Sequence, residues 1–290
     1  MKIVKLKGGL GNQMFQYAFA KLLEKRSGCE VKIDLSPYLE LNGDLIRKPR
    51  ILKFNISLSI ASKEDINSIC KLSHTGNSQT NKYRIGIALE YLFNRRYFFE
   101  RNHHGCTVQE MLKYDFFDGY WQNWNYIDEI IDELREEFTP VNMISEHSQK
   151  ELKLIESCDS ICVGVRRGDY LTSEPKHYGT MNMDYYERAM HIIEQKIKEP
   201  TYFIFSNDVN WVKKNMIFPK KNIVYITDTV DDFEDLILMS KCKHSIIPNS
   251  TFHWWGARLN EHRGKTVIAP SKWFADDAKI NILPERWERV

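Results

Sequence analysis

The chain has 290 residues, of which 42% are hydrophobic, so it is long enough for two domains that each bury a core. Its net charge of +2 gives no reason to expect a nucleic-acid partner, although anionic substrates are compatible with it. Six cysteines are scattered without a C-x-x-C pair, which argues against a zinc site and against a disulfide framework, so we interpret the thiols as reduced.

The first elements form a β-α-β unit. Ile3 to Leu6 predicts a short strand, a glycine-rich turn follows, and Gln13 to Arg26 predicts a helix because its apolar residues recur on one face. The segment CEVKIDL, Cys29 to Leu35, predicts a second strand that ends near an aspartate. Such a unit is the usual opening of an α/β fold with a parallel sheet.

The middle of the chain, about 45 to 115, is polar and weakly periodic, and it carries basic runs at 47–50 and at Arg95, Arg96 and Arg101. Two interpretations stay open for these runs. They belong to solvated helices and loops, or they contact an anionic glycolipid or a membrane surface.

The second half of the chain predicts another parallel α/β domain. A charged helix at Asp128 to Phe138 closes with Thr139 and Pro140, which suggests the approach to a linker. Beyond it, strands and helices alternate. The expected strands are 160–165, 201–205, 222–226, 244–247 and 266–269, and the expected helices are 184–198, 232–241 and 251–259. We therefore predict domains at 1–145 and 146–290.

Ligands of open parallel sheets bind beyond the carboxyl ends of the strands, so the residues there are the candidates for chemistry. The strand 161–165 runs into Arg166 and Arg167, whose guanidinium groups suit a bidentate grip on phosphate. A structural pair, with one arginine bonded to Asp169, is the alternative. The strand 201–205 is followed by Asp208, which can accept from guanine or ribose donors or can cap the next helix.

The strand at His244 to Ile247 leads into four small or apolar residues before a helix. A helix N-terminus offers free backbone N–H groups and a favourable dipole to a phosphate, although the same hydroxyls can be simple N-caps. The four residues are Asn249, Ser250, Thr251 and Phe252. No Asp-x-Asp triplet stands at a strand end, so we expect no metal and no other cofactor.

Five motifs together resemble the alpha-1,2-fucosyltransferases, glycosyltransferase family eleven in its bacterial form. They cover nearly the whole chain in the order of that family: KGGLGNQMFQYA, FDGYWQNWNYI, GVRRGDY, FSNDVNWVK and NSTFHWWGARL. The resemblance implies a GT-B architecture, with two Rossmann-like domains whose parallel sheets face a central cleft. It also implies that the C-terminal domain holds GDP-fucose and the N-terminal domain contacts the acceptor.

The resemblance assigns roles to individual residues. Arg166 is expected at the β-phosphate, Asp208 at the guanosine, and Ser250 with Thr251 at the phosphates, while Arg167 and Asp169 hold the loop or flank the cleft. On the acceptor or fucose side we expect the glycine turn and an aromatic pair, namely Gly9, Gly11, Asn12, Gln13, Tyr120 and Trp121. Gly8, Gly9 and Gly11 would let backbone approach the sugar, and aromatic packing is the alternative for Tyr120 and Trp121.

The chain departs from the family pattern H-x-R-R-G-D-Y at its first position. Gly164 stands where a histidine is expected near the nucleotide, so either guanine is held without an imidazole or another side chain or a water fills the space. A milder departure is Asn207, where many members carry an aspartate.

The function implied is an inverting transfer of L-fucose from GDP-β-L-fucose to the 2-hydroxyl of a terminal galactose in a surface polysaccharide, glycolipid or oligosaccharide. Candidate bases for the acceptor hydroxyl are Asp169, Glu174 and His177, with Asp169 slightly preferred. No stretch approaches the ~20 apolar residues that span a bilayer. We therefore expect a cytoplasmic protein of bacterial origin, at most peripheral at the inner face of the membrane.

Two alternatives come from other classes. A nicotinamide-dependent oxidoreductase is suggested by Gly9-x-Gly11 between two strands and by the terminal Asp34, although Met14 occupies the third glycine position. A catalytically silent sugar-binding protein of the same fold is made conceivable by Gly164.

Overall fold

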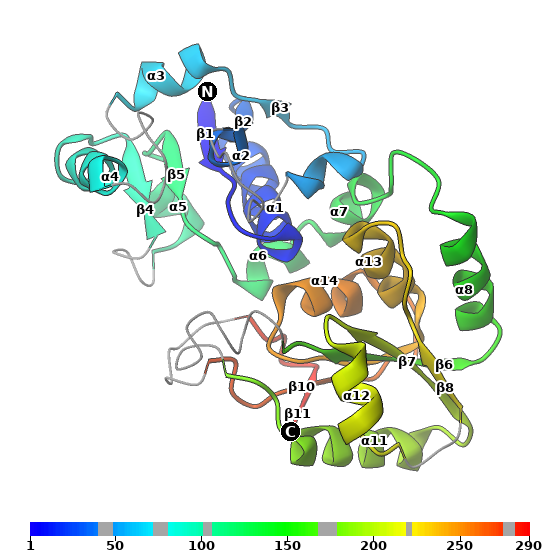
Figure 1. Ribbon diagram of the computed structural model, residues 1–290. Coiled ribbons are helices and arrows are strands. Elements are labelled where there is room, and N and C mark those ends of the chain that lie inside the picture. Colours follow the sequence, from blue (N-terminus) through cyan, green and yellow to red (C-terminus); the bar gives the residue numbers. More distant parts are fainter. Residues whose placement is uncertain (40–48, 72–80, 101–105, 168–178, 219–221, 275–281) are drawn as a thin grey trace. The chain divides into compact units, whose positions relative to one another are not determined.

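The computed structural model describes residues 1–39, 49–71, 81–100, 106–167, 179–218, 222–274 and 282–290 (Figure 1). Contacts divide the chain into two compact units, Met1–Val141 and Asn142–Val290. The sequence placed the division after residue 145, a few residues further along. Both units are α/β and both contain a parallel sheet, as the sequence predicts.

The N-terminal unit is built on a sheet with the strand order β3-β2-β1-β5-β4, in which every described pairing is parallel. Its elements are β1 (Lys2–Lys5), α1 (Leu10–Ser27), β2 (Val31–Asp34), α2 (Ser36–Leu39), η1 (Arg50–Lys53), β3 (Ser59–Ile60), α3 (Lys63–Ile69), α4 (Asn81–Phe93), β4 (Tyr97–Phe99), α5 (Val108–Met111), β5 (Phe116–Asp118), α6 (Trp124–Asp128) and α7 (Ile131–Glu137). β1 lies at the centre of this sheet and is buried along its whole length.

The helix α1 begins earlier than its apolar pattern predicts, because the glycine turn sets its start. Gly9 is the N-cap in an extended conformation, and Gly8 before it has a φ of +83°, which residues with a Cβ rarely adopt. The helix ends at Gly28, whose left-handed φ of 62° lets its N–H reach the Glu24 carbonyl. The glycines thus fix both ends of α1 against β1.

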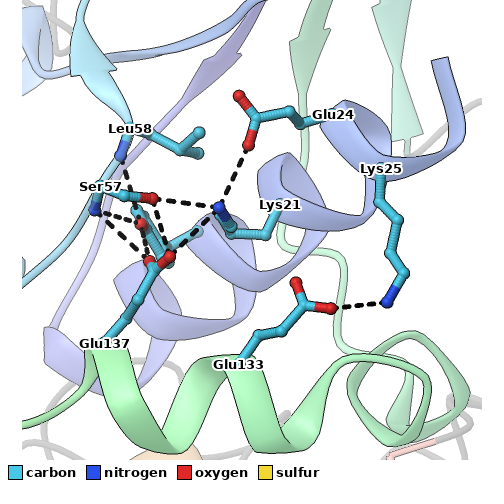
Figure 2. Close-up of polar contacts among 8 residues, drawn as sticks. Lys21, Glu24, Lys25, Ser57, Leu58, Glu133 and Glu137 are labelled. Carbon is cyan, nitrogen blue, oxygen red and sulfur yellow. Dashed lines mark hydrogen bonds and ion pairs between the residues drawn. The ribbon is translucent and has the colours of Figure 1, made fainter. Parts of the chain in front are cut away.

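A polar cluster fastens α1 to α7 (Figure 2). The Glu137 carboxylate accepts from the Ser57 hydroxyl at 2.7 Å and from the Tyr17 hydroxyl, and it lies 3.1 Å from the Lys21 ammonium. Burial would raise the pKa of Glu137, but these donors outweigh it and lower that pKa. Glu137 is therefore held as a carboxylate that joins α7 to α1 and to the segment before β3.

The C-terminal unit has the strand order β11-β10-β9-β6-β7-β8, again with parallel pairings throughout its described part. Its elements are α8 (Glu146–Glu156), β6 (Asp159–Val165), α11 (Met183–Lys196), β7 (Pro200–Ser206), α12 (Val209–Asn215), β8 (Ile223–Tyr225), α13 (Asp232–Lys241), β9 (His244–Ile246), α14 (Thr251–Leu259), β10 (Val267–Ala269) and β11 (Glu288–Arg289). Helices α11 and α12 cover one face of the sheet, and α13 and α14 cover the other (Figure 1).

The centre of this second sheet is its best-paired region. β6 and β7 pair over their full lengths, from Asp159 opposite Pro200 to Val165 opposite Ser206, and β9 pairs with the other side of β6. Apolar residues of these strands form one core with α11 and α12. Because the strands are parallel, the segments that follow β6, β7 and β9 all leave from the same edge of the sheet.

Candidate active site

The two arginines after β6 have different surroundings. Arg166 is half-buried at the edge of the sheet. The backbone N–H of Arg167 donates to Asn207 Oδ1 at 3.1 Å, and its guanidinium carbon lies 3.6 Å from the centre of the Trp211 ring. Arg167 thereby joins the segment after β6 to the one after β7, which is a loop-holding role. Asp169, Glu174 and His177 lie outside the described residues.

Asp208 caps the helix that follows it. One of its carboxylate oxygens, Oδ1, accepts from the Trp211 N–H at 3.1 Å, so the capping interpretation is confirmed for that oxygen. Contact between Asp208 and guanosine stays a prediction. Asn207, the milder departure from the family pattern, accepts from Arg167 and so contributes to the same arrangement of loops.

The N-terminus of α14 has no cap from its N-cap side chain. Ser250 is extended and buried, and its hydroxyl makes no capping hydrogen bond to the first turn. Asn249 is also buried, and its Nδ2 donates to the Trp273 carbonyl at 3.1 Å, so its amide orders the preceding segment. The half-buried Thr251 and Phe252 begin the helix. Amides of an uncapped first turn are the donors that bind an anion at a helix N-terminus.

A histidine brings the first turn of α14 against the end of β6. A Cβ at Gly164 would lie only 2.2 Å from His253 Cδ2, so the imidazole occupies the space that any side chain at 164 would need. The His253 Nε2 lies 3.4 Å from the carbonyl oxygen of Phe205, the residue that pairs with Gly164 across β6 and β7. Of the alternatives left open by the sequence, the structure shows the one in which another side chain fills this space.

The His253 ring is neutral. Burial, and next the charge of Arg166, lower the pKa of His253 to about 3. Arg166 therefore lies near enough to His253 for its charge to be felt, and Arg166 follows Gly164 by two residues. The contact of Gly164 with His253 thus brings the end of β6, which Arg166 follows, to the N-terminus of α14, two features that the sequence identified from separate strand ends.

The glycine turn of the N-terminal unit is organised by its own side chains. Gln13 is fully buried, with Nε2 donating to the Gly8 carbonyl at 3.1 Å and Oε1 accepting from the Ile51 N–H at 2.9 Å. Its predicted role toward sugar hydroxyls is wrong, since both ends of the amide are engaged inside the fold. Asn12 is half-buried, and its Oδ1 accepts from Gln122 Nε2 at 2.9 Å. Gly9 is half-buried and Gly11 is buried.

The two aromatic candidates after β5, Trp121 and Tyr120, differ in exposure. The Trp121 ring is 1% exposed and stacks on Phe19, with 3.9 Å between ring centroids and 9° between planes. A sugar cannot reach that ring, so the prediction that Trp121 stacks on the acceptor is wrong and its packing alternative is the one observed. Tyr120 is 43% exposed, and the Lys7 ammonium lies 4.9 Å from the centre of its ring.

A charged cluster at the carboxyl ends of β1 and β5 was missed by the sequence interpretation. The buried carboxylate of Asp118 lies 3.5 Å from the Lys5 ammonium and 2.5 Å from that of Lys7, and it accepts from the Tyr97 hydroxyl at 2.9 Å. Burial would raise the pKa of Asp118, but the two lysines and Tyr97 together hold it well below the usual range. The signals were the two lysines before the glycine turn and the FDG segment.

Asp34 lies opposite Lys5 across β1 and β2 and completes this edge of the sheet. It is fully buried, and its Oδ1 accepts from the Ser36 N–H at 2.8 Å. Burial raises the pKa of Asp34, while the Lys5 charge opposes that shift. Asp34 therefore has a structural explanation as the residue that ends β2 and turns the chain into α2.

In the part of the chain that the structure describes, no group of three or more His, Cys, Asp or Glu side chains is arranged to hold a metal ion. None of the described helices combines the length and the apolar character needed to cross a bilayer.

An arginine near a helix N-terminus, at the carboxyl edge of a parallel sheet, is an arrangement that suits a phosphorylated ligand. The family comparison then gives the particular class. The chain belongs to glycosyl transferase family 11, whose sequence model matches residues 1–288. This membership argues against the oxidoreductase alternative. Whether the protein is a catalytically silent sugar-binding protein is tested by the experiment given below.

Two curated relatives cover almost the whole chain. An Escherichia coli O-antigen biosynthesis glycosyltransferase, WbnK, is 32% identical over 97% of this chain and 98% of its own length. An Escherichia coli alpha-1,2-colitosyltransferase is 33% identical over 99% of this chain and 98% of its own. The crystal structure of the fucosyltransferase NodZ from Bradyrhizobium covers 88% of this chain and 90% of that one, at 13% identity and a TM-score of 0.43, which is too distant a likeness to carry an argument.

Proposed function

We propose that the chain is an inverting glycosyltransferase that moves L-fucose from GDP-β-L-fucose to the 2-hydroxyl of a terminal galactose in a surface glycan or glycolipid. The observation that carries the proposal is the contact between Gly164 and His253, which places the end of β6, with Arg166 two residues further on, against the first turn of α14 in a chain of family 11. Guanidinium and helix amides are a complementary pair of donors for a diphosphate. The expected place of action is the cytoplasm, at most at the inner face of the membrane.

In this mechanism the acceptor hydroxyl attacks the anomeric carbon from the face opposite GDP, through an oxocarbenium-like transition state. The bond to the diphosphate oxygen breaks as the new glycosidic bond forms, so negative charge grows on GDP as it leaves. Arg166 and the positive end of the α14 dipole at Thr251 stabilise that charge more strongly in the transition state than in the ground state. The candidate bases Asp169, Glu174 and His177 lie outside the described residues, and Asp169 keeps its place as the preferred one.

A second donor is favoured by one comparison. The relative that is 33% identical over 99% of this chain is an alpha-1,2-colitosyltransferase. Colitose is the 3-deoxy form of fucose, so the two donors differ by one hydroxyl. A site that hydrogen-bonds that hydroxyl rejects the deoxy sugar strongly, whereas an apolar site separates the two only weakly.

A donor and acceptor panel tests the proposed function. Purified protein is incubated with GDP-fucose or GDP-colitose, with and without lactose or N-acetyllactosamine, and GDP release and product linkage are measured by mass spectrometry with linkage analysis. We expect GDP release that depends on the acceptor, a 2-linked fucosyl product and a preference for GDP-fucose. A preference for GDP-colitose would reassign the donor, and nucleotide binding without transfer would support the silent sugar-binding protein.

Asn12→Ala tests which ligand the glycine turn serves. We expect a loss of about tenfold or more in transfer rate, with GDP affinity changed by less than about twofold, because the Asn12 amide offers neutral donors and acceptors that suit sugar hydroxyls. Gln122→Ala is the matched control, since it removes the 2.9 Å bond to Asn12 while leaving the Asn12 side chain in place. A larger loss in GDP affinity than in transfer rate would indicate that the glycine turn contacts the nucleotide and not the sugar.

A further inference from the structure

His253 is a buried titratable group of the C-terminal unit that the proposed mechanism leaves unused. It lies in the first turn of α14 and is 4% exposed. An isolated buried imidazole loses hydration of both ring nitrogens, so its retention at this position requires a reason. Its neighbours supply one, because Gly164 and Phe205 lie at the ends of the two strands that lead into the proposed donor site.

The ring contacts the ends of two strands at once. Its Cδ2 edge faces Gly164, where even a methyl group would come within 2.2 Å. Its Nε2 lies 3.4 Å from the Phe205 carbonyl, and since a carbonyl only accepts, Nε2 carries the proton. The contact therefore orients the ring and binds the first turn of α14 to β6 and β7.

The surroundings of the other ring nitrogen fit a neutral imidazole. Nδ1 is buried and has no hydrogen-bond partner among the described residues. A neutral ring that donates from Nε2 has an unprotonated Nδ1, which is less costly to bury than a second N–H with a positive charge. A neutral ring can lie near Arg166 without adding a second cation to the site. Burial, and next the Arg166 charge, lower the pKa of His253 and so favour the neutral ring.

We infer that His253 is a positioning residue of the donor site, whose ring sets the separation between Arg166 on the β6 side and the backbone amides that begin α14. Gly164 is also required for this arrangement, because only a residue without a side chain leaves room for the His253 ring. The inference rests on the proposed function, since it concerns the diphosphate that those two groups would hold. A displacement of about 1 Å between them is enough to cost about 100-fold in rate.

Two substitutions of similar size test the positioning role. His253→Leu fills the space without a donor, whereas His253→Gln keeps an N–H that can reach the Phe205 carbonyl. We expect His253→Leu to lower kcat about 10- to 100-fold while GDP affinity falls less, and we expect His253→Gln to recover part of that loss. Met239→Ala is the control, because Met239 of α13 packs against Gly256, about one turn beyond His253 in α14. It should lower Tm and leave kcat and GDP affinity unchanged.

A double-mutant cycle tests the contact itself and does not depend on catalysis. Gly164→Ala should lower Tm in the wild-type background and change it much less in a His253→Ser background, where the space is free. Equal effects in both backgrounds would overturn the inference, as would a His253→Leu enzyme within twofold of wild type in kcat, or a kcat loss that Met239→Ala reproduces. If wild-type protein bound no GDP, the proposed function itself would be wrong, and the inference with it, while the cycle would still report the contact.

Discussion

Arg166→Ala is expected to lower kcat by about two to three orders of magnitude. Removal of one preorganised donor from a developing negative charge typically costs ~3 to 4 kcal/mol of transition-state stabilisation. In the proposed mechanism Arg166 is the donor next to that charge. It follows β6, and its charge lowers the pKa of His253, which lies in the first turn of α14. The measurement is the initial rate of acceptor-dependent GDP release at saturating GDP-fucose, together with GDP affinity by calorimetry.

Arg166→Lys and Arg167→Ala are the comparisons that sharpen this result. A lysine keeps the charge and loses the bidentate geometry, so we expect a smaller but clear loss in kcat. Arg167 stacks on Trp211, so its removal should lower Tm and affect kcat less than Arg166→Ala does. An Arg166→Ala enzyme with a near-normal rate, or one less impaired than Arg167→Ala, would contradict the assignment of the phosphate contact to Arg166.

Local patterns predicted most of the C-terminal unit. The helices α13 and α14 occupy the residues that their apolar periodicity predicts, and the strands β6, β7, β8, β9 and β10 lie within a residue or two of theirs. Buried strands between amphipathic helices give a strong signal because each element buries a defined face. The alternation therefore predicted a parallel sheet and the edge at which Arg166 and Ser250 stand.

The middle of the chain was harder to predict because its elements are short. β3, β4 and β5 have two or three residues each, too few to show a periodic pattern. They are strands because neighbouring strands pair with them: β2 with β3, β1 with β5, and β5 with β4. The same limit explains Trp121. Its burial against Phe19 depends on packing that no local pattern records, so an aromatic residue expected on the acceptor side proved to be core.

The site itself depended on two contacts between residues distant in the sequence. Gly164 read alone indicates only a missing side chain, and His253 read alone indicates only a polar residue in a helix. Their contact becomes visible when β6 and α14 are placed side by side, and it turns a departure from the family pattern into a packed pair. The Lys5 and Asp118 pair is similar, since Asp118 follows Lys5 by more than one hundred residues and the two meet through the pairing of β1 with β5.

That buried pair leads to the largest expected change in stability. Asp118→Ala should lower the free energy of unfolding by about 3 kcal/mol, the lower end of the cost of removing one partner from a buried ion pair. The lower end applies because Asp34 stays close enough to Lys5 for their charges to interact. Lys25→Ala is the control, as its 2.6 Å pair with Glu133 is solvent-exposed and should contribute less than about 1 kcal/mol. Urea unfolding monitored by circular dichroism gives both values.

The pH dependence of stability provides an independent check with a second variant, Asp118→Asn. Because the folded-state pKa of Asp118 is lowered, the Asp118 carboxylate stabilises the protein fully above the unfolded-state value of about 3.9, and the contribution is lost as pH falls through the folded-state value. The stability difference between wild type and Asp118→Asn should therefore be constant from pH 8 to about pH 5 and should shrink in more acidic solution. A difference that stayed constant down to about pH 2, or that appeared only in acid, would show that Asp118 is not the anion that Lys5 and Lys7 hold at this edge of the sheet.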